Sequence, residues 1–368
     1  MCLILLGMEG SAAQSSQLAA VPSASCVEFK CSISPSQDVP TSAHALRPGD
    51  IKHVAALGDY LTAASGIRDI LPFPGVRSKD LSFSGGCGSK LAKLSTLPSN
   101  SIPYVLRHFN PSLYGCAKDS YRKGRGHFNV ADKGRLTSAD RLAALQVYEL
   151  LRRVRRELTA DQLKNDWKLI NVHVGLGDLC TACKFPADHT AALFGQRLGR
   201  ALQKLKRHLP RTVVSVAAPP SGGTVAGGAA RGGVCAQRIR YDCPCALSDA
   251  DGTRRLSAAY VAELRKIERS ALSTADDDFT VVVQPFVSGV HSAPRHPDGT
   301  VDLSFYTHRC FHGSVKAHNA FGRMLWNNLI EPVGKKTTYT EFTDKIQLAC
   351  PNSDCPYLRT VKNSEKCV

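Results

Sequence analysis

The stretch "HVAALGDYLTA" (His53–Ala63) begins as an apolar run and breaks at Gly-Asp-Tyr. A near-continuous run of Val, Ala and Leu is typical of a strand that is covered on both faces. The glycine that ends the run allows a sharp change of direction. We therefore predict a buried strand over Ile51–Asp59, with Asp59 and Tyr60 at its carboxyl end.

Three further runs have the same apolar character, over Trp167–Gly175, Arg211–Ala218 and Asp278–Phe286. Between and after them, apolar residues recur with the 3.6-residue period of a helix over 138–158 and 191–209, and 314–334 gives a last helix. Alternating strands and helices favour an α/β fold with a mainly parallel sheet between helical layers.

The composition suggests one large domain with terminal segments. We predict a leader or weak signal segment over 1–25, an extended arm over 26–50, the α/β domain over 51–345 and a tail over 346–368. No apolar run approaches the roughly 18 residues that a membrane span requires. The Gly/Ala-rich stretch 215–235 lacks periodicity and is predicted to be a flexible loop; its glycines do not have the pattern of a phosphate-binding loop.

The net charge of +16 raises the question of nucleic-acid binding. Two of the three basic clusters, over 152–158 and 204–211, fall on polar faces of predicted helices, and no nucleic-acid motif occurs. We expect no nucleic-acid partner. Attraction to an anionic membrane surface fits the charge at least as well.

Fourteen cysteines indicate an oxidising, extracellular compartment. The spacings Cys180-x-x-Cys183 and Cys243-x-Cys245 fit disulfides better than zinc, because no pair of histidines completes a tetrahedral set. We predict a local Cys180–Cys183 bridge, and a second bridge among Cys235, Cys243 and Cys245. A disulfide is also favoured for Cys87 over a reactive thiol.

Four short stretches follow the predicted strands, where parallel sheets bind ligands. They are "GDYL" (58–61), "FNVADKG" (128–134), "VGLGDLC" (174–180) and "HRCFH" (308–312). With "DFTVVVQPF" and "LWNNLIEPVGKKTT", they resemble in order the motifs of phospholipase B-type members of the SGNH (GDSL) hydrolases, from about residue 29 to near the C-terminus. This resemblance implies a three-layer, flavodoxin-like α/β/α sandwich, hydrolysis of acyl esters of phospholipids and lysophospholipids, and no metal or cofactor.

The family's catalytic roles transfer to some positions and fail at others. His312 occupies the position of the catalytic base, Gly134 that of an oxyanion-hole glycine, and Asp59 is retained. Tyr60 replaces the nucleophilic serine. Gly177 replaces the asparagine that donates to the oxyanion, and Arg309 replaces the aspartate that orients the histidine.

These substitutions damage separate parts of one mechanism. We therefore interpret the chain as a pseudoenzyme of this family. Three alternatives stay open: a weak hydrolase that uses Tyr60 or a cysteine, a non-catalytic lipid-binding or interaction protein, and a decayed duplicate or one unit of a tandem-repeat protein. Ser65 is predicted to lie on the helix after the turn, where it cannot replace the serine. The sequence does not indicate an oligomeric state.

Overall fold

A computed structural model describes residues 29–68, 78–88, 100–118, 127–132 and 139–367 of the chain. Cys31–Val368 forms one compact unit. At its centre, four strands lie in the order β1-β2-β3-β4 and every neighbouring pair is parallel. The strands are β1 (Ile51–Gly58), β2 (Trp167–His173), β3 (Thr212–Ala217) and β4 (Phe279–Gln284). They correspond to the four predicted apolar runs, and the predicted α/β sandwich is confirmed.

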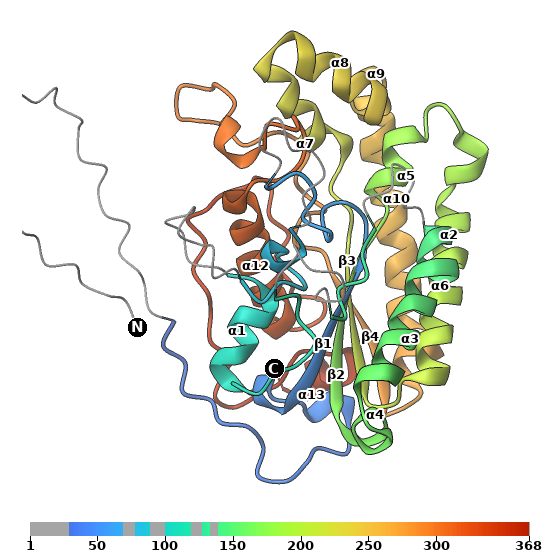
Figure 1. The fold of residues 1–368 in the computed structure, drawn as a ribbon, viewed down its shortest axis with the longest axis vertical. Helices are drawn as coiled ribbons and strands as arrows, with labels where there is room; N and C mark the ends of the chain where they lie inside the picture. Colours follow the sequence, from blue (N-terminus) through green and yellow to red (C-terminus); the bar gives the residue numbers. More distant parts are fainter. Residues whose placement is uncertain (1–28, 69–77, 89–99, 119–126, 133–138, 368) are drawn as a thin grey trace, which may run out of the picture. The chain divides into compact units, whose positions relative to one another are not determined.

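Helices cover both faces of the sheet (Figure 1). One face packs against α3, α6 and α10, whose apolar residues form one core cluster with alternate residues of the strands. The other face is covered by α1 and α12. The described α-helices are α1 (Ile102–Phe109), α2 (Ala139–Arg141), α3 (Val147–Glu157), α4 (Ala160–Asn165), α5 (Leu176–Thr181), α6 (Ala191–His208), α7 (Gly222–Ala226), α8 (Gly233–Asp242), α9 (Cys245–Ser248), α10 (Ala250–Arg269), α11 (Ala271–Thr274), α12 (Val315–Ile330) and α13 (Val361–Lys366). A π-helical segment, Leu142–Gln146, joins α2 to α3.

Two segments without helix or strand structure cover the outer edge of β1. The Tyr114 carbonyl accepts a hydrogen bond from Val54 N, and the Phe128 carbonyl accepts one from Ala56 N. Val130 N in turn donates to the Ala56 carbonyl. The stretch 128–132 is thereby held along β1, toward the strand's carboxyl end.

The prediction of a flexible loop over 215–235 is wrong. This stretch contains the end of β3, helix α7, a 3-10 turn over Gly227–Arg231 and the start of α8. Its glycines serve close packing: a Cβ on Gly223 would lie 2.0 Å from the His291 carbonyl oxygen, and one on Gly228 would lie 2.0 Å from the Cys310 carbonyl oxygen. Short helices of small residues carry no apolar period, so the sequence pattern missed them.

The predicted disulfide connectivity is also wrong, although the prediction of disulfides is confirmed. Cys180 pairs with Cys243 and Cys183 pairs with Cys245, because α9 packs against α5 and brings both pairs of cysteines together. Cys235 pairs with Cys310. The remaining bridges are Cys87–Cys116, Cys31–Cys350 and Cys355–Cys367.

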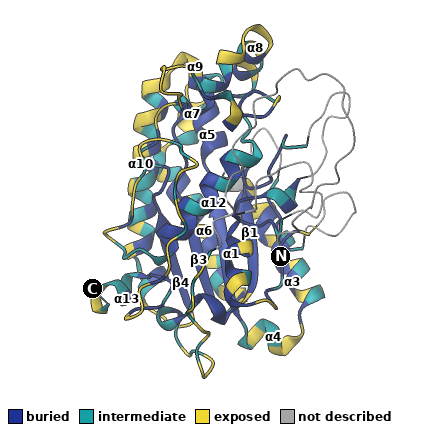
Figure 2. Ribbon diagram, turned by 90° about the vertical axis from the view of Figure 1, so that its left-hand side faces the viewer, coloured by how far each residue is buried: buried dark blue, intermediate teal, exposed yellow. Residues whose placement is uncertain are grey.

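The segments on either side of 51–345 make specific contacts within the compact unit. The Leu46 carbonyl accepts a hydrogen bond from Leu358 N, and His44 Nδ1 lies 2.8 Å from the Thr360 hydroxyl. The Cys31–Cys350 disulfide joins the two segments covalently. Figure 2 shows the strands buried inside the unit. None of the described helices has the length and apolarity that crossing a membrane requires.

The six disulfides predict a low thiol content for the native protein. They use twelve of the fourteen cysteines and leave Cys2 and Cys26, which lie outside the described residues. Denatured without reductant, the chain should therefore expose at most two reactive thiols, and after reduction all fourteen. Four or more thiols in the non-reduced sample would contradict this connectivity.

Candidate active site

The carboxyl end of β1 lies against the carboxyl end of β2 at Gly58. A Cβ on Gly58 would lie 2.1 Å from the His173 carbonyl oxygen, and Gly58 has a φ of +150°, so only glycine fits there. The buried side chain of Gln146 holds both polar groups of this residue: Gly58 N donates to Oε1 at 2.7 Å, and Nε2 donates to the Gly58 carbonyl at 2.8 Å. The π-helical segment ends at Gln146. A π-helical turn changes which residues face the sheet, and here it accompanies an inward-pointing glutamine.

Asp59 and Tyr60 follow directly on this fixed backbone. Asp59 is buried, and its Oδ1 accepts a hydrogen bond from Leu61 N at 3.0 Å. The same oxygen lies 3.6 Å from His173 Nδ1, which is too long for a hydrogen bond. Residues 60–68 then form consecutive turns, so the helix predicted for Ser65 is not present.

Tyr60 is partly exposed as a residue, but its hydroxyl oxygen is fully buried. This hydroxyl has no hydrogen-bond partner among the described residues. Burial raises the pKa of Tyr60 well above its ordinary value, and the nearby charge of Asp59 raises it further. A neutral phenol in this place is both hard to ionise and unable to hand its proton to a neighbour.

The loop 308–313 brings His312 against Tyr60. Their ring centroids are 4.9 Å apart in an edge-to-face arrangement. Phe311 contacts both rings, at 5.4 Å from Tyr60 and 4.4 Å from His312. Tyr60 and His312 therefore lie side by side, and their side chains meet through ring contacts.

Arg309 occupies the same corner. The His312 Nδ1 atom faces the Arg309 backbone carbonyl at 3.5 Å. A Cβ on Gly66 would lie 3.0 Å from Arg309 Cγ and 3.3 Å from the His312 Cβ atom. The turns after Tyr60 thus pack directly against this loop.

Gly177 lies in α5, which begins immediately after the carboxyl end of β2. It is buried, and its carbonyl accepts a hydrogen bond from the Thr181 hydroxyl at 3.3 Å. The preceding residue, Leu176, lines the same pocket as Tyr60. Gly177 has no side-chain amide to donate, whatever its position. Gly134 lies outside the described residues.

An apolar pocket with an empty volume of about 440 Å³ opens beside Tyr60. Tyr306, one of the two tyrosines in its lining, donates its hydroxyl to the Thr224 carbonyl at 2.7 Å. The lining comes from several distant parts of the chain: Tyr60, Leu61, Leu176, Pro220, Thr224, Val225, Pro294, Phe305, Tyr306, Phe311, Gly313, Ala317, Phe321 and Phe342. Sequence reasoning missed these walls, because apolar residues in irregular segments have no periodic signal.

Helix α5 also takes part in a series of hydrogen bonds outside the pocket. Asp178 Oδ1 lies 3.0 Å from His189 Nδ1, and His189 Nε2 lies 3.0 Å from the Thr181 hydroxyl. Burial raises the pKa of Asp178, and the hydrogen bond to His189 partly offsets this increase. All three residues belong to one short segment, so these hydrogen bonds fix α5 to the turn that follows it.

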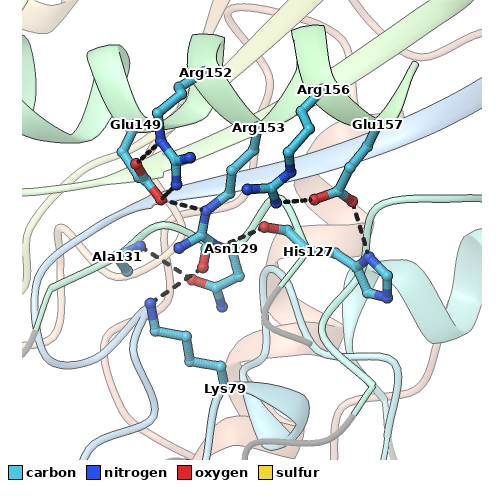
Figure 3. A network of polar contacts seen from close by, with 9 residues as sticks. All are labelled: Lys79, His127, Asn129, Ala131, Glu149, Arg152, Arg153, Arg156 and Glu157. Atoms are coloured by element: carbon cyan, nitrogen blue, oxygen red, sulfur yellow. Dashed lines mark hydrogen bonds and ion pairs between the residues drawn. The ribbon is translucent and has the colours of Figure 1, made fainter. Parts of the chain in front are cut away.

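The stretch 128–132 is anchored by a charged network on α3 (Figure 3). Arg153 donates to the His127 carbonyl at 2.6 Å and to Glu149 at 2.7 Å. Hydrogen bonds, from Arg152 first and then Arg153, lower the pKa of Glu149 to about 2. Arg153 of the basic cluster predicted over 152–158 therefore holds His127, and two residues further on Asn129 Nδ2 donates to the Thr62 carbonyl.

No group of three His, Cys, Asp or Glu side chains within the described ranges has a geometry that could hold a metal ion. Tyr60 lines the apolar pocket, and the ring of His312 packs against the ring of Tyr60.

This fold and site place the chain in a known class. Residues 54–325 match the GDSL-like Lipase/Acylhydrolase family, and the chain belongs to that family.

Among curated proteins, the chain is similar to "Phospholipase B1, membrane-associated" from Homo sapiens, with 36% identity over 356 residues. The proteins of the same name from Mus musculus and Rattus norvegicus are each 34% identical, over 363 and 347 residues. These alignments cover 90 to 92% of this chain but 23% of each relative, so the chain spans about a quarter of their length. The predicted family resemblance is confirmed.

The Gln146 contacts predict a measurable stability cost. Replacing Gln146→Leu removes the partner of Gly58 N, and an unpaired buried N–H costs about 1 to 3 kcal/mol. We expect the free energy of unfolding, measured by urea titration, to fall by that amount. The neighbouring change Leu145→Gln is the control, since Leu145 is 51% exposed and should shift the value by less than about 0.5 kcal/mol. Equal effects of the two changes would refute the assigned role of Gln146.

Proposed function

We propose that this chain is a phospholipase B-like protein that has lost ester hydrolysis and keeps a pocket for the acyl chain of a phospholipid or lysophospholipid. The observation that carries the proposal is the buried hydroxyl of Tyr60, which has no hydrogen-bond partner among the described residues, while the ring of Tyr60 packs edge-to-face on His312. A hydrolase of this family needs an activated nucleophile at that position.

Tyrosine is unsuited to that role for reasons of reach and acidity. Its oxygen lies several bonds farther from the backbone than a serine oxygen, so its ring fills space that a scissile carbonyl would need. A nucleophilic hydroxyl is activated by a hydrogen bond to a general base. Tyr60 contacts His312 through its ring, and its pKa is raised rather than lowered.

The other two substitutions act on the remaining parts of the mechanism. Charge separation during attack produces an imidazolium, which a carboxylate stabilises and a guanidinium opposes. Arginine at 309 supplies no carboxylate, and its backbone carbonyl lies 3.5 Å from His312 Nδ1. Glycine at 177 lacks the amide donor, and loss of one such donor typically lowers the rate about 100- to 1000-fold.

The pocket supports a retained apolar ligand. Its walls include four phenylalanines, and the Tyr306 hydroxyl is turned to a backbone carbonyl. A hydrocarbon chain matches this lining, because apolar walls gain no hydrogen bonds from a polar ligand.

The hydrolase alternative that uses a cysteine is the weaker one, since the twelve cysteines among the described residues are all in disulfides. Disulfides persist in oxidising compartments, which supports an extracellular or extracellular membrane-associated location. Relatives named as membrane-associated phospholipases point the same way.

Turnover by stepwise revertants tests the proposal. We expect no hydrolysis of a short-chain ester or of lysophosphatidylcholine by the natural chain, and none by Tyr60→Ser alone. Tyr60→Ser, Arg309→Asp and Gly177→Asn together should restore measurable turnover, and omitting Gly177→Asn should lower it about 100- to 1000-fold. His312→Ala added to the triple variant should abolish it again.

Three outcomes discriminate the alternatives. Phospholipid turnover by the natural chain that Tyr60→Phe abolishes would overturn the proposal and make Tyr60 the nucleophile. Activity in the Tyr60→Ser variant alone would mean that Arg309 and Gly177 are tolerated. A folded but inactive triple variant that also fails to bind monomeric lysophosphatidylcholine by calorimetry would favour an interaction protein or a decayed copy.

A further inference from the structure

Large hydrophobic side chains on the surface are concentrated near the pocket. Eight are exposed within the described ranges, and three of them lie on α8 and α9: Val234 (80% exposed), Tyr241 (66%) and Leu247 (38%). A fourth, Phe185, follows Cys183, which is bonded to Cys245 of α9. Single exposed hydrophobics are ordinary, but a cluster beside an apolar pocket calls for a partner.

Helix α8 is apolar on two sides. Its inner residues, Cys235 and Ile239, are buried in the cluster of apolar residues against which Tyr60 packs. Val234 and Tyr241 are seven residues apart, so they lie on one face of the helix, and that face is exposed. The inner side of the helix is buried in this cluster, whereas Val234 and Tyr241 on the outer side are exposed.

Disulfides fix this surface in place. Cys235 of α8 is bonded to Cys310 in the His312 loop, and Cys243 and Cys245 are bonded to the α5 segment. Helix α7, which contributes Thr224 and Val225 to the pocket, leads directly into α8 through a 3-10 turn. In Figure 1 the ribbons of α7, α8 and α9 lie together beyond the carboxyl ends of the strands, and Figure 2 shows exposed residues along α8 and α9.

The same helix carries two arginines, Arg238 and Arg240, and one aspartate, Asp242. Arg238 lies between Val234 and Tyr241 and is 3.4 Å from Asp242, and Arg240 is exposed. Arg231, just before the helix, donates to the Leu303 and Tyr306 carbonyls at 3.0 Å each. Apolar and aromatic side chains interleaved with arginines are typical of surfaces that bind anionic lipid. The apolar side chains insert among the lipids, and the arginines contact the head groups. The chain's net charge of +16 adds a long-range attraction of the same sign.

We propose that Val234, Arg238, Arg240, Tyr241 and Leu247, the α8–α9 face, form a docking surface for an anionic phospholipid membrane. Docking there places the neighbouring pocket at the lipid surface, from which an acyl chain enters with little exposure to water. The proposal rests on the proposed function for its lipid partner, but it does not require that the pocket be occupied.

Vesicle sedimentation with the full chain tests the docking surface. The chain should bind phosphatidylcholine vesicles that contain phosphatidylserine more than pure phosphatidylcholine vesicles, and binding should weaken as salt rises. Val234→Ser with Tyr241→Ser should lower the partition coefficient about tenfold or more, because two apolar side chains no longer insert. Arg240→Gln should weaken binding to the anionic vesicles alone.

The matched control is Leu145→Ser with Tyr148→Ser. These side chains are 51% and 62% exposed and lie on the π-helical segment and α3, away from the pocket. The control should keep wild-type vesicle binding. Equal loss in both double variants, or no preference of the natural chain for anionic vesicles, would overturn the proposal. So would sedimentation velocity showing that the α8–α9 face joins two copies of the chain.

A second measurement separates this inference from the proposed function. Calorimetry with lysophosphatidylcholine below its micelle concentration reports the pocket alone, and the Val234 and Tyr241 double variant should bind it as the natural chain does. Vesicle binding without lysolipid binding would refute the lipid pocket and leave the docking surface standing. Loss of both vesicle and lysolipid binding in that variant, together with lower thermal stability, would indicate a folding defect. In that case Arg240→Gln, which removes no apolar contact, becomes the test of the docking proposal. Unchanged binding of Arg240→Gln to anionic vesicles would overturn it.

Discussion

The close approach of β1 to β2 at Gly58 is the constraint on which the rest of the site depends. With 2.1 Å between a would-be Cβ and the His173 carbonyl, the strand can turn here only at a glycine. The Gln146 side chain pairs with both backbone groups of that glycine and so fixes the direction in which the chain leaves the strand. The backbone of Gly58 thereby sets the positions of Asp59 and Tyr60, which follow it directly. A tyrosine at the second position must therefore meet the loop of His312.

The short helices around the pocket are held together differently from the central sheet. The strands and their helices share a continuous apolar core, whereas the elements around the pocket are short and joined by three disulfides. Short helices gain little stability on their own. Covalent links compensate, and they let glycine-rich segments pack backbone against backbone, as Gly228 does on the Cys310 carbonyl. The inner face of α8 and its disulfide hold the helix in place, and its outer face is exposed.

The sheet and the long periodic helices could be predicted from the sequence because burial on both faces, or on one helical stripe, leaves a regular apolar signal. Helix α10 leaves a weaker signal, since Thr253, Ser257 and Glu268 are among its buried residues. The positions of Tyr60, Arg309 and His312 followed from motif order and the parallel topology. Disulfide partners, the Gln146 contacts and the pocket walls could not be predicted, because each depends on how distant segments pack.

Comparing two hydroxyl groups in one pocket tests the central claim most directly. The Tyr60 hydroxyl is buried without a hydrogen-bond partner among the described residues, whereas the Tyr306 hydroxyl donates to the Thr224 carbonyl at 2.7 Å. Tyr60→Phe should therefore leave the free energy of unfolding unchanged or raise it by up to about 2 kcal/mol, and Tyr306→Phe should lower it by about 1 kcal/mol. A loss of stability in Tyr60→Phe equal to that in Tyr306→Phe would show that the Tyr60 hydroxyl is hydrogen-bonded. It would contradict the account of Tyr60 as an inert side chain in the nucleophile's place.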